Sequence, residues 1–259
     1  MRLKDKVIFI TGGGNGIGAS TAKICAGYGA KVFVTNRTLS AAEKVVEEIK
    51  KAGGEATAYP LDVTNLDAIK EAVAAAVKAY GRIDGLFNNA GRGAMHTIVE
   101  TSPEEFETVI NTCVRGEYFV AAEVAKAMIP NKSGRIVNMS SITGYGAEYG
   151  SSLYCMSKAA IMMMTKVMAL ELAEHGITAV TICPGHIDTG LLTGAFTELG
   201  KMEGKSVDTY YKEMIDTIPM KRLASADEVG EFVAFLFDER SAYMDGNSVL
   251  FAGGKIMGW

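Results

Sequence analysis

Short apolar runs rich in β-branched residues alternate with longer amphipathic stretches along the whole chain. The runs are nearly continuous in apolar side chains, which is typical of strands whose two faces are both covered by helices. Strands that alternate with helices indicate a single α/β domain over residues 1–259, built on a doubly wound parallel sheet with helices on both faces. The pattern predicts seven strands, at residues 6–11, 30–36, 55–61, 83–89, 134–141, 177–183 and 247–253.

Polar residues with capping chemistry predict where three helices begin. Ser40 with Glu43 and Ser225 with Glu228 have the spacing of a capping box, in which each side chain accepts a hydrogen bond from the other residue's N–H. Ser102 is followed by a proline, which fits the first position of a helix. The long irregular stretch near 184–225 has no comparable signal, and we expect residues 190–225 to form a lid over a binding site.

Composition and charge narrow the classes of partner. The net charge is −4 and no cluster of Lys and Arg is present, which argues against a nucleic-acid or anionic-membrane surface. The most apolar helical stretch is interrupted by Lys166 and Glu171 and is too short to span a bilayer. Four widely spaced cysteines fit reduced thiols, and three scattered histidines indicate no metal site. We therefore expect a cytoplasmic protein whose partner is a small molecule.

A glycine-rich turn near the start of the chain carries the first chemical signal. The sequence VIFITGGGNGIGASTAKICAGYGAKVFVTN combines a strand, the turn, a helix and a second strand. Gly12 permits the tight turn, Gly16 lets backbone N–H groups approach a pyrophosphate, and Gly18 lets the helix pack closely. The turn therefore predicts a dinucleotide site to which Asn15 and Ile17 also contribute.

The spacing of these glycines, G-x-x-x-G-x-G after a threonine, resembles the short-chain dehydrogenase/reductase family. Further motifs of that family follow in order along the whole chain, namely LDVT, NNAG, VNMSS, YCMSK and CPGHIDT. The resemblance implies a Rossmann-like fold and a nicotinamide cofactor. It also implies cofactor contacts at Asp62, Val63, Asn89, Ala90, Gly91, Pro184, Gly185, Ile187 and Thr189.

A tyrosine and a lysine four residues apart, Tyr154 and Lys158, share one face of a predicted helix. A free tyrosine is a poor base at neutral pH, and a nearby ammonium favours its phenolate and lowers its pKa. The resemblance implies that Tyr154 is the general acid/base, that Lys158 tunes it and binds the nicotinamide ribose, and that Ser141 polarises the substrate oxygen. It also implies that Asn111 supports a water that connects Lys158 to solvent.

The residues after the second strand bear on the choice of cofactor. An acid here would bind the ribose hydroxyls of NAD and repel a 2′-phosphate. The chain instead has the neutral Asn36 followed by Arg37 and Thr38, a set that accepts a phosphate. We therefore expect NADP(H) rather than NAD(H).

The substrate is less well determined. The predicted lid and the closing YMDGNSVLFAGG resemble the branch that acts on acetoin, diols and sugar alcohols, so a small diol, hydroxyketone or sugar alcohol is the first expectation. Apolar residues before the tyrosine (Ile142, Tyr145 and Tyr149) leave open a hydroxysteroid or bile acid. His96 and His186 border the cleft in relatives and either contact substrate or are solvated. The lid combines polar residues with Leu191, Leu192, Phe196, Met202, Tyr210, Tyr211 and Met214.

Two further alternatives remain open. A 3-oxoacyl thioester would require a basic patch at the mouth of the cleft, and the cations of the lid do not cluster convincingly. A catalytically silent NADP-sensing regulator typically lacks the tyrosine or the lysine, whereas this chain retains both. The family resemblance also implies a homotetramer or homodimer.

Overall fold

The computed structural model describes residues 2–93, 95–190, 192–194, 196–197 and 204–255. Its centre is a seven-stranded sheet in which every pair of neighbouring strands is parallel. The strand order β3-β2-β1-β4-β5-β6-β9 confirms the predicted doubly wound fold. The strands are β1 (Val7–Ile10), β2 (Lys31–Asn36), β3 (Glu55–Pro60), β4 (Gly85–Asn88), β5 (Gly134–Met139), β6 (Ile177–Pro184) and β9 (Ser248–Phe251).

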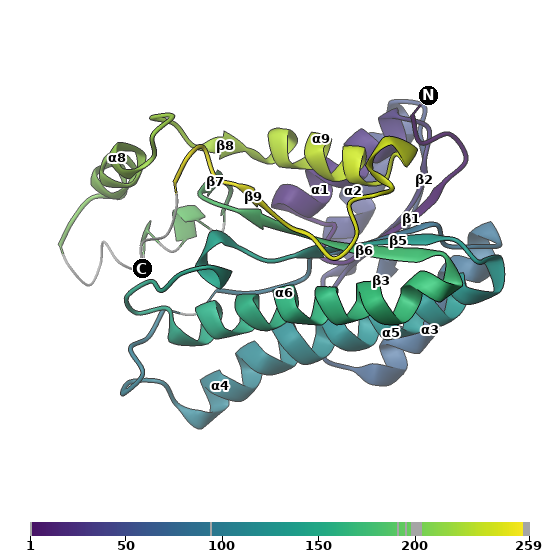
Figure 1. Cartoon of the computed structure of the whole chain (residues 1–259). Coiled ribbons are helices and arrows are strands. Elements are labelled where there is room, and N and C mark those ends of the chain that lie inside the picture. The colour runs from purple at the N-terminus through teal and green to yellow at the C-terminus, as the bar shows by residue number, and fades with distance from the viewer. Residues whose placement is uncertain (1, 94, 191, 195, 198–203, 256–259) are drawn as a thin grey trace.

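Helices cover both faces of this sheet (Figure 1). One layer contains α1 (Gly16–Gly27), α2 (Leu39–Lys51) and α9 (Ala226–Leu236). The other contains α3 (Leu66–Tyr80), α4 (Pro103–Ile110), α5 (Glu117–Met128) and α6 (Ser152–Leu172), and a π-helical segment, η1 (Asn111–Gly116), joins α4 to α5. Short 3₁₀ turns are η2 (Ile129–Asn131), η3 (Ile142–Gly144), η4 (Ala173–His175) and η5 (Glu239–Ser241).

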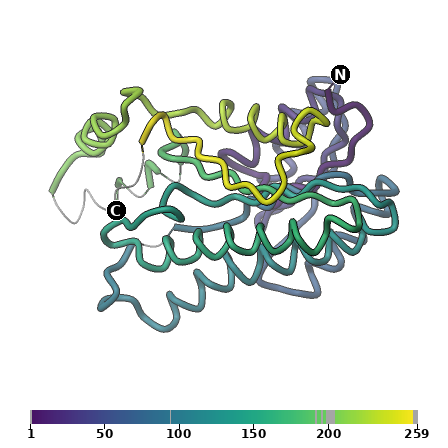
Figure 2. The backbone as a smooth tube through the Cα atoms, viewed as in Figure 1, coloured from purple at the N-terminus to yellow at the C-terminus, as the bar shows by residue number. Residues whose placement is uncertain are grey.

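The predicted lid region contains regular structure of its own. Helix α8 (Val207–Thr217) lies beyond one end of the sheet rather than over either face (Figures 1 and 2). Two short strands, β7 (Ile187–Asp188) and β8 (Ala224–Ser225), pair in parallel at the two ends of the region. The sequence did not predict these strands, because two residues are too few to give a periodic pattern.

The core has two halves, one on each face of the sheet. Ile8 and Ile10 pack against the layer of α1 and α9, whereas Phe9 between them belongs to the cluster on the other face. Phe9 stacks on Phe33 of the next strand with ring centroids 5.4 Å apart. All four residues are almost fully buried, which explains why the strands read as continuous apolar runs.

Two of the three predicted helix starts are confirmed. Ser225 and Glu228 form a complete capping box at α9. Ser102 accepts the N–H of Glu105 at 3.1 Å and caps α4. The prediction for Ser40 is wrong, because α2 already begins at Leu39 after Thr38 and leaves the serine inside the helix.

Contrary to the expectation from the sequence, one helical stretch, Ser152–His175, is long and apolar enough by length and composition to cross a membrane, and it is the only one in the part of the chain that the structure describes. Its inner face, with Ile161 and Thr165 fully buried, packs on the sheet beside β5 and β6. We therefore interpret α6 and the turn after it as a core helix.

Candidate active site

The crevice for a ligand is set by the sheet topology. Strand order reverses between β1 and β4, so the chain leaves these neighbouring strands toward opposite faces. Thr11 connects the segments that follow β1 and β4, because its hydroxyl oxygen accepts the N–H groups of Asn89 at 2.9 Å and Ala90 at 3.0 Å. The Asn89 amide in turn donates to the carbonyls of Thr11 and Gly12, at 3.1 and 3.2 Å. The NNAG segment therefore fixes the position of the glycine turn.

The glycine turn has the close packing that a phosphate cradle requires. Gly12 and Gly16 have φ angles of +63° and +51°, which other residues rarely adopt. A Cβ on Gly18 would collide with the carbonyl oxygen of Gly12 and would lie 2.7 Å from the amide nitrogen of Asn89. Only glycine at this position lets α1 approach the turn so closely.

The start of α1 suits an anion. The first turn of the helix contains no acidic residue, and the side chain of Asn15 makes no capping hydrogen bond to its N–H groups. These N–H groups and the helix dipole favour a negatively charged group such as a pyrophosphate. Thr189 faces this turn, since its Cγ2 would lie 3.6 Å from a Cβ on Gly16. The residues present therefore fit a nicotinamide dinucleotide.

The ends of β2 and β3 form the far corner of the crevice. The main-chain N–H of Leu61 donates to the carbonyl of Asn36 at 3.0 Å, which places Asp62 next to the end of β2. The Asn36 amide donates to the carbonyl of Thr38 at 3.0 Å, and Arg37 is exposed. Asp62 accepts the N–H and hydroxyl of its own neighbour Thr64. Among the described residues, the Arg37 guanidinium makes no ion pair or hydrogen bond, whereas the Asp62 carboxylate is already bonded to Thr64.

A cavity of about 500 Å³ extends from the glycine turn to the lid. Ile17 and Asn89 lie at the cofactor end, and Ser141, Tyr154 and Lys158 line its middle. The predicted CPGHIDT contacts are also brought here, since Pro184, Gly185, Ile187 and Thr189 line the cavity. From the lid region, its walls include Leu192, Phe196, Tyr210, Glu213, Met214 and Thr217. Of the predicted lid residues, Leu191 and Met202 lie outside the described residues.

The structure brings Ser141, Tyr154 and Lys158 together. Ser141 caps η3 just after β5, and its oxygen accepts the N–H of Thr143 at 3.2 Å. The Ser141 hydroxyl lies close enough to the Tyr154 phenol to favour its phenolate. The ammonium of Lys158 lies 5.7 Å from the centre of the Tyr154 ring, as the shared helix face predicts.

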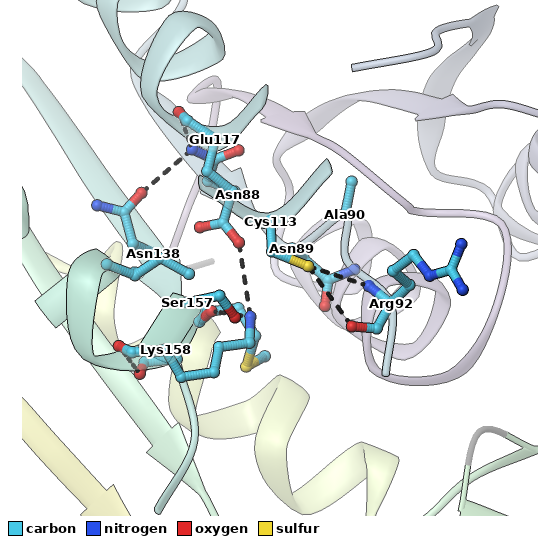
Figure 3. Close-up of polar contacts among 12 residues, drawn as sticks. Asn88, Asn89, Ala90, Arg92, Cys113, Glu117, Asn138, Ser157 and Lys158 are labelled. Carbon is cyan, nitrogen blue, oxygen red and sulfur yellow. Dashed lines mark hydrogen bonds and ion pairs between the residues drawn. The ribbon is translucent and has the colours of Figure 1, made fainter. Parts of the chain in front are cut away.

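Two further groups hold the Lys158 ammonium in the interior, and Figure 3 shows one of them, Glu117. Its Nζ donates to the carbonyl of Met139 at 2.8 Å. It also lies 3.6 Å from the carboxylate of Glu117, and both side chains are almost completely buried. Sequence reasoning missed Glu117, although a carboxylate inside an otherwise apolar helix face was a visible signal.

The structure does not bring Asn111 to this group. Asn111 begins η1, does not line the cavity, and is absent from the interactions that the described residues make with Lys158. The thiol of Cys113 is there instead, with Sγ 3.4 Å from the N of Arg92 and close enough to Lys158 for their charges to interact. Asn111 and Cys113 are two residues apart and lie on different sides of the helix, so they cannot both lie beside Lys158. The role predicted for Asn111 has no support in this geometry.

Burial has the largest effect on the pKa values of Tyr154 and Glu117. Burial raises the pKa of Tyr154 above its ordinary value, and the charge of Lys158 and the neighbouring Ser141 hydroxyl only partly offset this effect. The charge of Lys158 lowers the pKa of Tyr154 as the sequence predicted, but burial has the larger effect in the protein chain alone. Burial also raises the pKa of Glu117 to about 8, against the opposing charge of Lys158.

The two loop histidines differ in their surroundings. His96 is exposed. His186 lines the cavity, and its buried Nδ1 has no hydrogen-bond partner among the described residues. Burial, with a smaller contribution from Lys255, lowers the pKa of His186 to about 4. The ring of His186 is therefore neutral at physiological pH.

Comparison with known proteins agrees with this geometry. The chain is 36% identical over 257 residues to the oxidoreductase UcpA of Salmonella typhimurium, covering 99% of this chain and 96% of that protein. It is 35% identical over 257 residues to the 3-oxoacyl-(acyl-carrier-protein) reductase FabG of Thermotoga maritima, covering 99% of this chain and all of that protein.

Solved structures give the same result. A xylitol dehydrogenase bound to NAD⁺ is 32% identical, with a TM-score of 0.93 over 98% of this chain and 100% of that one. An actinorhodin polyketide ketoreductase with NADPH is 31% identical, with a TM-score of 0.93 over 96% of each chain. Residues 6–199 match the family described as short chain dehydrogenase. The chain thus belongs to the short-chain dehydrogenase family of oxidoreductases.

Proposed function

We propose that this chain is an NADP(H)-dependent enzyme that interconverts a secondary alcohol and a ketone, with Tyr154 as its general acid/base. The observation that carries the proposal is the convergence of Ser141, Tyr154 and Lys158 on the cavity that begins at the glycine turn. The nicotinamide, when bound, supplies or accepts the hydride. The side chains of the protein manage the matching proton.

In ketone reduction the Tyr154 hydroxyl donates its proton to the substrate oxygen. The Ser141 hydroxyl donates a hydrogen bond to the same oxygen and stabilises the negative charge that develops there. The Lys158 ammonium stabilises the phenolate that remains, because an opposite charge nearby favours the ionised form. Alcohol oxidation uses the same groups in reverse, with the Tyr154 phenolate as base.

The choice of NADP(H) over NAD(H) is supported by the end of β2. Arg37 is exposed there and no carboxylate occupies the position of Asn36. A guanidinium binds a 2′-phosphate in two-point fashion, and a neutral amide does not repel it. The solved relatives include one bound to NAD⁺ and one with NADPH, so they do not decide between the two.

For the substrate we propose a small diol, hydroxyketone or sugar alcohol. The cavity contains Glu148, Glu213, Thr217 and Lys255 beyond the catalytic groups, and these can bind additional hydroxyl groups. The Lys255 ammonium already donates to the Thr217 hydroxyl at 2.9 Å. The similarity to a xylitol dehydrogenase agrees with this choice.

A second candidate, a hydroxysteroid or bile acid, is favoured by the apolar wall of the same cavity. Met95, Ile142, Leu192, Phe196 and Met214 line it, and within the lid the rings of Phe196 and Tyr210 stack with centroids 5.6 Å apart. A rigid apolar ketone would bury more surface against this wall than a polyol would. The relative named as a 3-oxoacyl reductase keeps a thioester in the set to be tested.

For assembly we propose a single-domain subunit that pairs with copies of itself. Met156, Met163, Val167 and Leu170 of α6 are exposed to between 42% and 82% and recur at helical spacing on one side of the helix. An apolar stripe of this kind is the usual mark of a protein–protein contact. A second copy of the chain, as a homodimer or homotetramer, would cover it.

The test is oxidation of NADPH and NADH in the presence of a panel of ketones. The panel contains small diketones, keto-sugars, keto-steroids, oxo-bile acids and an acetoacetyl thioester. We expect the highest kcat/KM with NADPH and a small diketone or keto-sugar. A preference for NADH would overturn the cofactor assignment, and turnover of keto-steroids alone would favour the second candidate.

A further inference from the structure

The buried carboxyl group of Glu117 has no part in the proton transfer described above. Glu117 is 1% exposed, and its two carboxylate oxygens have no hydrogen-bond partner among the described residues. Its charged neighbour is the ammonium of Lys158, at 3.6 Å (Figure 3). A buried carboxylate without hydrogen bonds destabilises a fold unless a charge compensates it. The pair is therefore unlike an ordinary surface ion pair.

A polar network fixes the position of Glu117 relative to α6. The amide of Asn88 donates to the main-chain carbonyl of Glu117 at 2.7 Å and to the side-chain oxygen of Asn138 at 3.3 Å. Asn138 donates in turn to the hydroxyl of Thr165 at 2.9 Å. These bonds join α5, β4, β5 and α6, so the separation between Glu117 and Lys158 is set by the frame of the protein.

Three titratable groups surround the carboxylate. Lys158 and Tyr154 face it from α6, and Cys113 faces it from η1. Burial acts to lower the pKa of Lys158, but the negative charges of Glu117, Tyr154 and Cys113 outweigh this effect and raise it. Of these three groups, Glu117 raises the pKa of Lys158 the most. Without it, less would oppose the effect of burial on the Lys158 amine.

We propose that Glu117 is a positioning residue for the catalytic lysine: at alkaline pH its carboxylate holds the Lys158 ammonium in place and keeps it charged, so that Lys158 continues to favour the Tyr154 phenolate. This inference rests on the proposed function, because it gives Lys158 the role stated there. It also accounts for a carboxylate kept in the interior despite the cost of burial.

The proposal predicts a pH-dependent effect rather than a uniform loss. Below about pH 8 the Glu117 carboxyl is protonated, and the isosteric variant Glu117→Gln resembles it closely. Above that pH the wild-type carboxylate retains the proton on Lys158, whereas the variant loses it at lower pH. The alkaline limb of kcat/KM therefore lies at lower pH in Glu117→Gln, and beyond it activity falls by about tenfold per pH unit relative to wild type.

The experiment compares kcat/KM against pH for wild type, Glu117→Gln and Glu117→Asp, with NADPH and the ketone turned over best. The aspartate variant retains the charge and is expected to restore part of the alkaline activity. Glu123→Gln is the matched control, because Glu123 lies on the same helix and pairs with Lys126 at 2.9 Å near the surface. Superimposable profiles for wild type and Glu117→Gln would overturn the proposal.

A second measurement separates this inference from the proposed function. Urea unfolding of wild type, Glu117→Gln, Lys158→Met and the double variant gives a double-mutant cycle without any turnover. We expect the double variant to be less destabilised than the sum of the single variants above about pH 8, and additivity to return at acidic pH. Additive effects at every pH would overturn the pairing, whether or not wild type oxidises NADPH. Absence of NADPH oxidation would count against the proposed function alone.

Discussion

The hydroxyl of Ser140 donates a hydrogen bond of 2.7 Å to the main-chain carbonyl of Lys158. This bond joins the end of β5 to the helix that carries the tyrosine and the lysine. Ser141, the next residue, therefore has a fixed position relative to Tyr154. The geometry of the site depends on this contact between a strand and a helix as much as on the side chains of Ser141, Tyr154 and Lys158.

Ser140→Ala is expected to loosen the site while leaving its chemical groups in place. Loss of one buried hydrogen bond costs about 1 kcal/mol of unfolding free energy. Because α6 is then less firmly held, kcat falls by roughly tenfold with little change in the Kd for NADPH. Ser241→Ala is the control, since the Ser241 hydroxyl is also buried and donates to Leu236 at 2.9 Å, away from the site. Equal losses of kcat in the two variants would contradict this account.

Gly18→Ala is expected to damage the cofactor site. The added methyl group meets the main chain of Gly12, so the turn must shift, at a cost of about 1–3 kcal/mol in stability. NADPH binding, measured by the fluorescence of the bound nucleotide, should weaken strongly. Gly27→Ala tests the same chemical change at the other end of α1, where nothing lies within 4 Å of the new methyl group. Tight NADPH binding by Gly18→Ala would show that the turn does not need its close packing.

Arg37→Ala is expected to reduce the preference for NADPH over NADH. A charge-assisted hydrogen bond contributes about 1.5–3 kcal/mol, so kcat/KM with NADPH should fall by roughly ten- to a hundredfold. The value with NADH should change little, because that cofactor has no 2′-phosphate. Lys51→Ala removes an exposed cation from the far end of α2 and should affect neither cofactor. A parallel loss with NADPH and NADH in Arg37→Ala would remove the argument for a phosphate contact.

His186 is expected to make stability depend on pH. Burial holds its pKa near 4, below the ordinary value of 6.5, so the unfolded chain takes up a proton first as the pH falls. The contribution of the neutral ring is complete above about pH 6.5 and is lost as the pH falls through 4, a change of about 2 kcal/mol after allowance for partial exposure. Urea unfolding of His186→Gln should lack this component, whereas His96→Gln, with an exposed ring, should retain it. Identical pH profiles for wild type and His186→Gln would refute the prediction.

The sequence predicted the sheet and the shared helix face of Tyr154 and Lys158 well, because both follow from local patterns. Apolar runs mark strands that are buried on two faces, and Tyr154 and Lys158 share a helix face by spacing alone. The glycine turn was also predicted from the sequence. Its glycines are informative because the close approach of Gly18 and Gly12 leaves no room for a side chain.

The neighbours of Lys158 were harder to predict, because they come from another part of the chain. An irregular π-helical segment decides which side chain of residues 111–116 faces the lysine, and the sequence does not show that irregularity. It places the side chain of Cys113 near Lys158, whereas Asn111 does not line the cavity. Glu117 meets Lys158 only after α5 and α6 pack side by side.

The most direct test of the central claim is turnover by Tyr154→Phe, measured as NADPH oxidation with the ketone that wild type reduces best. Removing the phenolic proton should lower kcat by about 10²–10⁴-fold while NADPH still binds. Tyr243→Phe, at a fully exposed tyrosine, should match wild type. Wild-type turnover in Tyr154→Phe would contradict the assignment of this tyrosine as the general acid/base.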